Sequence, residues 1–516
     1  MPYTTGMPIL LVFALTAACL PVDWPAPLLG GGLETSATFT ITAVGLSLIA
    51  AFALRTWVVQ TLHRSPERKI EVSQAYARLR RRLFLINMGM VAVCVLVFGW
   101  GWLTQQLLVV DWGGKSPLAP FAELAVPLPY FAILFSAWLI YYDAERTLHC
   151  TTVLGPNNKE FWSRIGYFLN HLRQFALLVM LPVILFVTQQ TIDRFLPETT
   201  RSDWYRLGSA VAVPLLILFM PLLIKPLLGL RTMPAGPVRA RLEALAKRLH
   251  FHCTDFLLWP THGAMANAMI VGFLPRIRYV IFTDRILEEL PPDELDAVFG
   301  HEVGHAKHGH MWLYAVFLAL SITTLAAAFL LLGQQLDAAG VELPKWAEGW
   351  IALPPLILIV SYIFLVFGYL SRRCERQADV YGCRAVSCIN SNCLGHDEAT
   401  VYPERARRLC PTGIRTFIGA LQRVNMVNGN SGFDDEQAQT TRAIIKGFFE
   451  WLKSWLHSTM SRRMAFLRTL IGNPQNEQQF QLHVTMLRWG LILGLAGTLF
   501  GLGEVVGWQE LLQAMR

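Results

Sequence analysis

The chain has 516 residues, of which 53% are hydrophobic and only 16% charged, and its mean hydropathy is +0.40. Soluble globular proteins are about a quarter charged, so this composition excludes a disordered tail, a long coiled coil and a small disulfide-stapled secreted protein. A protein that crosses the lipid bilayer many times fits it better. The net charge of +8 then indicates basic loops on one side of the membrane and not a nucleic-acid surface.

Long apolar stretches recur along the chain, and a membrane-spanning helix needs about 20 mostly apolar residues. The candidates are residues 39–59, 83–108, 127–142, 175–187, 207–230, 312–332, 350–370 and 486–506. A further stretch, Met7 to Leu20, is short and is either a first span or a signal sequence; the lack of a basic segment before it favours a span. We therefore expect a mainly α, polytopic membrane protein with about eight or nine transmembrane helices.

The positive charges predict its orientation, because cytoplasmic loops carry an excess of Lys and Arg. The loop after residues 39–59 holds Arg64, Arg68, Lys69, Arg78, Arg80, Arg81 and Arg82. If this loop is cytoplasmic and successive spans cross the membrane in opposite directions, the two polar regions, 231–310 and 372–483, also lie on the cytoplasmic face. Because organelle signals are absent, the expected location is the inner membrane of a bacterium.

The same alternation divides the chain into five parts. They are an N-terminal transmembrane region (1–230), a small folded unit (231–310), a transmembrane hairpin (311–370), a cytosolic region (371–484) and a C-terminal transmembrane helix (485–516). Within the small folded unit, residues 237–250 have helical periodicity, and the apolar runs 256–259, 268–273 and 279–282 predict strands of a small sheet. Prolines and acids at 291–294 then begin another helix.

This last helix contains the pattern His-Glu-x-x-His, formed by His301, Glu302 and His305. Residues four apart share a helical face, so both histidines can bind one Zn²⁺, and Glu302 lies beside them to act as general base toward water. A zinc hydrolase also needs a third protein ligand. Glu375 and Asp379 are candidates for a ligand and for a carboxylate that holds a ligand, although this segment taken alone favours the plain charged end of a membrane helix.

Taken together, these motifs resemble the membrane zinc metallopeptidases that include the CAAX prenyl endopeptidases and the HtpX proteases (metallopeptidase family forty-eight, gluzincin group). That family has an Asn-Ala strand, an aspartate that ends the next strand, His-Glu-x-Gly-His and a later Glu-x-x-x-Asp. The corresponding residues here are Asn267 and Ala268, Asp284, His301 to His305, and Glu375 with Asp379.

The resemblance implies a small zincin-like α+β catalytic unit at the membrane surface. It implies that His301, His305 and Glu375 bind one catalytic Zn²⁺, that Glu302 is the general base, and that Asp379 orients a ligand histidine. It further implies that the strand around Asn267 pairs with the substrate backbone, and that His457 and Arg463 approach the oxyanion. The proline of the motif around His457 is missing here. A helix-end cap is the main interpretation of His308 and His310, with a supporting role as the alternative for His310 and a catalytic or ligand role as the alternative for His308.

Five of the nine cysteines lie between Cys374 and Cys410, in a region that departs from the family pattern. Cys383, Cys388, Cys393 and Cys410, with His396 nearby, leave three alternatives open: a second, structural Zn²⁺, disulfides, or reduced thiols. Their spacing is not the tight Cys-x-x-Cys of a zinc ribbon, and a cytoplasmic location disfavours disulfides. Farther on, apolar and basic residues between 446 and 463 predict a helix that lies on the membrane or packs on the protein.

The sequence therefore predicts a zinc-dependent membrane metalloendopeptidase. Its expected partners are polypeptide substrates, themselves membrane proteins, and the lipid bilayer, but not nucleic acid. Proteolytic quality control is the first expectation, and processing of C-termini, as by the CAAX endopeptidases, is the alternative in the same class. A catalytically inert transporter or scaffold with a zinc site is the alternative from another class.

Overall fold

The computed structural model is mostly helical and divides into two compact units. It describes residues 31–110, 122–152, 155–156, 161–263, 265–340, 353–388, 409–428 and 458–508, with Leu15, Trp24, Pro27 and Cys393. One unit takes in residues 8–205 and 345–351, and the other takes in residues 1–7, 206–344 and 352–516. His396, His457, the stretch Met7 to Leu20 apart from Leu15, and the amphipathic segment at 446–455 lie outside the described residues.

The first unit is built on three long helices, α2 (Leu33–Arg64), α3 (Lys69–Leu96) and α6 (Leu128–Cys150), which pack against one another. A buried polar cluster joins two of them, since Arg80 on α3 forms an ion pair with Glu145 on α6. Elsewhere their outward faces are apolar, for example at residues Ile41, Ile49 and Phe52 of α2. Exposed apolar faces on long helices are what a lipid environment requires.

Four described helices are long and apolar enough to cross a membrane: Leu33–Arg64, His310–Leu336, Ile357–Ala385 and Pro474–Val505. A fifth span results if the bent pair Pro66–Leu96 and Trp100–Val109, which meet at 56°, counts as one. The expected stretch 207–230 lies mainly in α10 (Asp203–Leu227), which holds Pro214, Pro221 and Pro226. Its apolar part, Pro214–Leu227, is shorter than a full span. The described helices thus support a multi-pass protein.

The second unit contains a four-stranded sheet in the order β3-β4-β6-β5. Its strands are β3 (Arg231–Thr232), β4 (Asp255–Trp259), β5 (Ala268–Val271) and β6 (Tyr279–Thr283). β4 and β6 run parallel, whereas β5 runs antiparallel to β6 and lies at the edge of the sheet. β4, β5 and β6 fall on the three apolar runs that predict strands.

Two helices cover one face of this sheet, α11 (Pro237–Arg248) and α13 (Pro292–Lys307). Phe256 and Phe282 from the strands pack around Phe299 of α13, and Phe299 is fully buried. Alternate residues of the same strands face the opposite side, where Leu257 and Ile281 join a second core. The sheet thereby fixes α13, the helix that carries the His-Glu-x-x-His motif.

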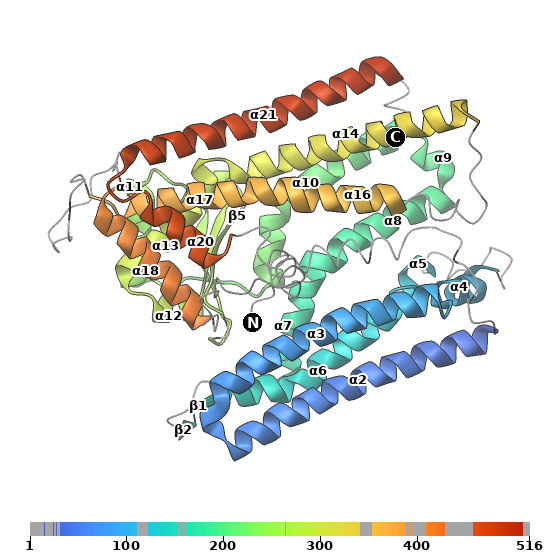
Figure 1. Cartoon of the computed structure of the whole chain (residues 1–516), viewed down its shortest axis with the longest axis horizontal. Coiled ribbons are helices and arrows are strands. Elements are labelled where there is room, and N and C mark those ends of the chain that lie inside the picture. Colours follow the sequence, from blue (N-terminus) through green and yellow to red (C-terminus); the bar gives the residue numbers. More distant parts are fainter. Residues whose placement is uncertain are drawn as a thin grey trace, which may run out of the picture. The chain divides into compact units, whose positions relative to one another are not determined.

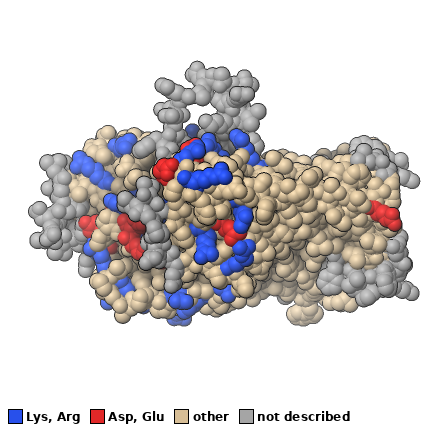
Figure 2. Space-filling model, turned by 90° about the horizontal axis from the view of Figure 1, so that it is seen from below, with Lys and Arg blue, Asp and Glu red and all other residues tan. Residues whose placement is uncertain are grey.

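Further helices of this unit follow α13 in the sequence. They are α14 (His310–Ala338), α16 (Leu353–Tyr362), α17 (Gly368–Ala385), α18 (Pro411–Val427), α20 (Met460–Arg468) and α21 (Pro474–Val506). α14 and α21 run side by side, and α16 continues through residues 363–367 into α17 (Figure 1). α17 and α18 both pack on α13. Figure 2 shows Lys, Arg, Asp and Glu side chains in clusters, and broad stretches of surface without charged side chains.

Candidate active site

The candidate site forms where α13 crosses α17, and small residues let the two helices approach closely. A Cβ atom added at Gly304 of α13 would lie 2.9 Å from the Cβ of Tyr381 and 3.1 Å from the Cα of Ala378, both on α17. Only glycine leaves room for this contact between backbones. The glycine of the His-Glu-x-Gly-His motif is therefore explained by packing, because it brings the acidic residues of α17 to the histidines of α13.

Three side chains converge at this crossing with the separations of a metal site. The Nε2 atoms of His301 and His305 lie 3.3 Å apart. Glu375 places one carboxylate oxygen 3.8 Å from Nε2 of His301 and the other 3.5 Å from Nε2 of His305. Donors about 2.0–2.1 Å from a tetrahedral Zn²⁺ are roughly 3.4 Å from one another. Two imidazole nitrogens and one carboxylate with this spacing fit zinc.

The charges around these donors also fit a divalent cation. Glu302, Glu375 and Asp379 bring three carboxylates to the cluster, and Arg463 of α20 brings one guanidinium. Glu375 and Asp379 are buried, with 3% and 0% of their surface exposed. Excess negative charge away from water is costly unless a cation balances it. With the carboxylates ionised, these four groups carry two excess negative charges, which is the charge that Zn²⁺ neutralises.

Asp379 holds the first histidine. Its Oδ1 lies 2.9 Å from Nδ1 of His301, which leaves Nε2 of that ring for the metal. Arg463 donates from Nε to the other oxygen of Asp379 at 2.9 Å, and its Nη1 lies 3.7 Å from Glu375. Burial lowers the pKa of Arg463, but the neighbouring Asp379 and Glu375 outweigh it and raise that pKa above the usual value of arginine. Arg463 therefore stays charged and supports the carboxylates of the site.

His310 holds the second histidine. Gly309 adopts φ +64°, a left-handed conformation that suits glycine, and this turn between α13 and α14 returns the chain toward His305. As a result Nδ1 of His310 lies 3.0 Å from Nδ1 of His305, and Nε2 of His310 lies 3.0 Å from Oε1 of Gln377. The amide of Gln377 in turn donates to Oε1 of Gln481 at 2.6 Å. His310 is completely buried, so this chain of contacts is shielded from water.

Glu302 faces the edge of the sheet. The backbone N–H of Ile270 in β5 donates to Oε2 of Glu302 at 3.2 Å. On the inner side of β5, Asn267 accepts a hydrogen bond at its carbonyl from the N–H of Thr283 at 3.0 Å. Backbone groups alternate in direction along a strand. The groups of Ala268 and Ile270 therefore point outward, away from β6 and toward the side where Glu302 lies.

A side chain caps one end of this edge. The amide of Asn428, which follows α18, accepts from the N–H of Ala266 at 2.9 Å and donates to the carbonyl of the same residue at 2.9 Å. The amide group thereby occupies the position of a neighbouring strand at Ala266. The outward backbone groups that follow along the chain, at Ala268 and Ile270, lie beside the metal-binding cluster.

The structure thus brings together most of the residues that the sequence indicates. His301, Glu302, His305, Glu375 and Asp379 meet at one place, and Arg463 joins them through Asp379 and Glu375. The backbone of Asn267 pairs with β6. Three cysteines also come together, Cys388, Cys393 and Cys410, but Cys383 is not part of that group. The sequence did not indicate Gln377, Gln481 or Asn428, because an isolated amide residue carries no pattern that predicts its partner.

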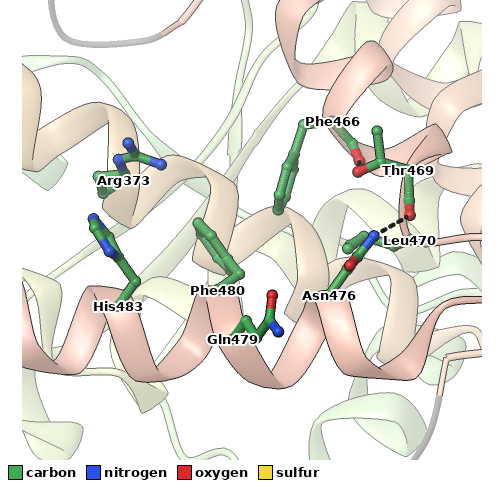
Figure 3. Close-up of a pocket in the computed structure, with 8 residues that line it drawn as sticks. All are labelled: Arg373, Phe466, Thr469, Leu470, Asn476, Gln479, Phe480 and His483. Carbon is green, nitrogen blue, oxygen red and sulfur yellow. Dashed lines mark hydrogen bonds between the residues drawn. The ribbon is translucent and has the colours of Figure 1, made fainter.

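A separate pocket of about 290 Å³ lies where α17, α20 and α21 meet (Figure 3). Its lining residues are Arg373, Phe466, Thr469, Leu470, Asn476, Gln479, Phe480 and His483. Asn476 closes one side by donating to the carbonyl of Thr469 at 3.1 Å. None of the metal-binding residues lines this pocket, so it is not the proposed reaction centre.

The part of the chain that contains this site is similar to known peptidases. Residues 233–394 match the family model described as Peptidase family M48. A CAAX prenyl protease 1 homolog of Dictyostelium discoideum is 30% identical over 195 residues, which are 36% of this chain and 45% of that protein. A protease HtpX homolog of Aeropyrum pernix is 29% identical over 210 residues, which are 39% of this chain and 64% of that protein. The chain thus spans less than two thirds of either relative.

Among solved structures, a crystal structure of Ste24p from S. mikatae matches with a TM-score of 0.45 and 16% identity. The match covers 84% of this chain and 98% of that one. The matched family segment runs from before β4 to beyond α17, so it contains His301, Glu302, His305, Glu375 and Asp379. Residues 233–394 are therefore similar to peptidase family M48, in agreement with the resemblance that the motifs indicate.

Proposed function

We propose that this protein is a zinc-dependent metalloendopeptidase of the membrane. The observation that carries the proposal is the convergence of His301, His305 and Glu375 beside Glu302, next to an open strand edge. These three side chains would hold one catalytic Zn²⁺. Zinc bound there supplies a Lewis acid that polarises the substrate carbonyl and makes water a better nucleophile at neutral pH.

Protein side chains would transfer the protons and hold the histidine ligands in place. Glu302 takes the proton from the attacking water and delivers it to the leaving amine. The N–H of Ile270 donates to one oxygen of Glu302 and so orients this carboxylate for the proton transfer. Asp379 and His310 fix the two histidine rings, so that neither ring has to reorient during the reaction.

The substrate would bind as an added strand along β5. An extended peptide that pairs with Ala268 and Ile270 gains backbone hydrogen bonds without requiring a particular side chain. It also places a peptide carbonyl near Glu302, because Ile270 contacts that carboxylate directly. Asn428 occupies the edge at Ala266 and would mark one end of the binding groove. His457, outside the described residues, stays a candidate for contact with the oxyanion.

Substrates are proposed to be membrane proteins, and quality-control proteolysis is the proposed role. Support comes from the position of the site, since α14 begins at His310 and is one of the helices that can cross a membrane. Processing of C-termini is the alternative, and some of the similar proteins bear the name CAAX prenyl protease 1 homolog. A zinc-binding transporter or scaffold without peptidase activity is the alternative from another class.

The topology also stays a proposal. It comprises about eight or nine spans, the five-part division of the chain, and an active site on the cytoplasmic side of a bacterial inner membrane. The basic residues between Arg64 and Arg82 are its basis. A cysteine introduced at the exposed Glu67 should react with an impermeant thiol reagent only after the cells are opened. The unaltered chain, which lacks this cysteine, is the control. Labelling of intact cells would overturn this orientation.

A peptidase assay with zinc analysis tests the proposed activity. The purified full chain should contain zinc and cleave an unfolded membrane-protein substrate, and Glu302→Gln should keep the zinc while cleavage falls at least about 100-fold. Glu289→Gln is the matched control, because Glu289 is exposed on α12 (Asp284–Glu289) and should leave cleavage unchanged. A zinc-loaded Glu302→Gln variant that cleaves as fast as the unaltered protein would overturn the proposal and favour the scaffold.

A further inference from the structure

Three buried cysteines meet at the junction between α17 and α18. Cys388 follows the end of α17, Cys410 is the N-cap of α18, and Cys393 lies between them in the sequence. Their exposed fractions are 6%, 0% and 6%, respectively. All three sulfur atoms lie within 4.8 Å of one another. Three metal-binding side chains are thus gathered in one buried place, on elements other than the helix α13.

The distance between two of these sulfurs distinguishes a disulfide bond from two separate thiols or thiolates. Sγ of Cys393 lies 3.8 Å from Sγ of Cys410. A disulfide would bring the two sulfurs to about 2.05 Å. Thiolates that share a tetrahedral Zn²⁺, each about 2.3 Å from the metal, lie about 3.8 Å from each other. The observed separation excludes a disulfide and fits a shared metal ion, although two reduced thiols in contact would lie equally far apart.

Polar groups contact two of the sulfurs. The backbone N–H of Gly413 donates to Sγ of Cys410 at 3.2 Å, at the positive end of the dipole of α18. Sγ of Cys393 donates to Oγ1 of Thr412 at 3.0 Å, and it would lose this proton on binding a metal as the thiolate. Ser387 fixes the backbone here, since its hydroxyl oxygen accepts from the N–H of Cys410 at 3.1 Å.

We propose that Cys388, Cys393 and Cys410 bind a structural Zn²⁺. Thiolates select zinc over hard cations such as Mg²⁺ and Ca²⁺, and the three sulfurs leave one position of the tetrahedron for a further donor. This ion is separate from the one at His301 and His305, because the two groups share no ligand. The proposal is independent of peptidase activity, since it rests on the cysteines alone.

Such an ion would secure one wall of the active site. It would connect the end of α17, which carries Glu375 and Asp379, to the beginning of α18. α18 packs on α13, and the ring of Phe417 on α18 stacks on His301 with 5.8 Å between the ring centroids. A metal that holds two helix ends stabilises the fold without entering the reaction. It would keep the imidazole of His301 backed by an aromatic ring.

Metal analysis of the purified full chain in detergent tests this site. The unaltered protein should contain two zinc ions per chain. Cys393→Ser should remove one of them, His305→Ala should remove the other, and the double variant should contain none. Cys383→Ala is the matched control, because Cys383 is equally buried on α17 but lies outside the group of three, and it should retain both ions.

A second measurement uses the unaltered protein and so does not depend on how a variant folds. When Co²⁺ replaces zinc, thiolate ligands produce an intense charge-transfer absorption in the near ultraviolet, whereas the His and Glu ligands of the other site do not. This absorption should be present, and chelation should make the three thiols reactive toward alkylation. One zinc ion per chain that Cys393→Ser retains would overturn the proposal. A disulfide between Cys393 and Cys410 in protein purified without oxygen would also overturn it.

Discussion

The Nδ1 atoms of His305 and His310 lie 3.0 Å apart, so one of these nitrogens carries the shared proton. The contact between Nε2 of His310 and Oε1 of Gln377, at 3.0 Å, decides which one. An amide oxygen can only accept, so the proton of His310 is on Nε2 and its Nδ1 accepts from His305. Nε2 of His305 is then unprotonated and directed toward His301 and Glu375. His310 thereby fixes the tautomer that a zinc ligand needs.

Replacement of His310 should accordingly weaken zinc binding. His310→Ala leaves Nδ1 of His305 without its acceptor, and loss of such a supporting contact typically lowers metal affinity about 10- to 100-fold. We expect cleavage to fall with the bound zinc and to recover when zinc is added in excess. Titration with a competing chelator measures the affinity. Activity that is lost while zinc affinity stays unchanged would contradict this positioning role.

Gly304→Ala should destabilise the protein although alanine is the better helix former by about 1 kcal/mol. The new Cβ atom would lie 2.9 Å from Tyr381 and would force α13 away from α17. Overpacking of this kind costs about 1–3 kcal/mol, and the separation of the helices should also lower zinc affinity. Gly333→Ala on α14 is the control, because nothing lies within 4 Å of its added Cβ. Thermal unfolding of the two variants compares these effects directly.

Arg463→Met should be among the most destabilising substitutions in the second unit. It leaves the buried Asp379 without its cation, and breaking a buried ion pair from one side typically costs about 3–5 kcal/mol. Arg463→Lys retains the charge but not the paired hydrogen bonds of the guanidinium, so an intermediate loss is expected. Unfolding by denaturant in detergent measures both. Equal stability of the Met variant and the unaltered protein would show that Asp379 is not ionised.

Acid should destabilise the protein partly through His308. Burial, followed by the charges of Arg488 and Arg384, lowers the pKa of His308 from 6.5 to about 4. In the unfolded chain the His308 imidazole is protonated below about pH 6.5, whereas in the folded protein it is protonated only near pH 4. The free energy of unfolding therefore decreases as the pH falls through this range. Between pH 7 and pH 5 the loss through this residue is about 1 to 2 kcal/mol.

His308→Gln should remove that part of the pH dependence. The comparison is the change in unfolding free energy between pH 7 and pH 5, measured for the variant and for the unaltered protein. Because His301 and His305 are present in both, their contribution cancels in the difference. Two identical pH profiles would contradict a neutral, buried His308.

The zinc-binding helix and the strands beside it were predictable because each is marked by a periodic pattern or a fixed spacing of residues in the sequence. His301 and His305 share a helical face at four residues apart, Pro292 and the following acids mark the start of α13, and apolar runs mark β4 to β6. The contact between Asp379 and Arg463 joins residues 84 positions apart, and that between Asn428 and Ala266 spans 162. Nothing in the local pattern predicts such partners, since the packing of whole helices determines them.

The cysteines show the same limit in another form. Their spacing left a metal site, disulfides and reduced thiols open, because the segment between Cys388 and Cys410 has no periodic pattern. One interatomic distance, 3.8 Å between the sulfurs of Cys393 and Cys410, excludes the disulfide between these two and leaves the metal site and the reduced thiols, and this distance depends on how α18 docks. A residue pattern can indicate which atoms are available, but only the fold determines how far apart they are.

The helix that supplies Glu375 is also the end of an apolar helix long enough to cross the membrane, Ile357–Ala385. His310 likewise begins a second such helix, His310–Leu336. Two groups of the reaction centre are therefore extensions of segments whose tilt depends on bilayer thickness. The packing of α13 on α17 ties Glu375 to the histidines, so the candidate metal site is built directly onto helices that can cross a membrane.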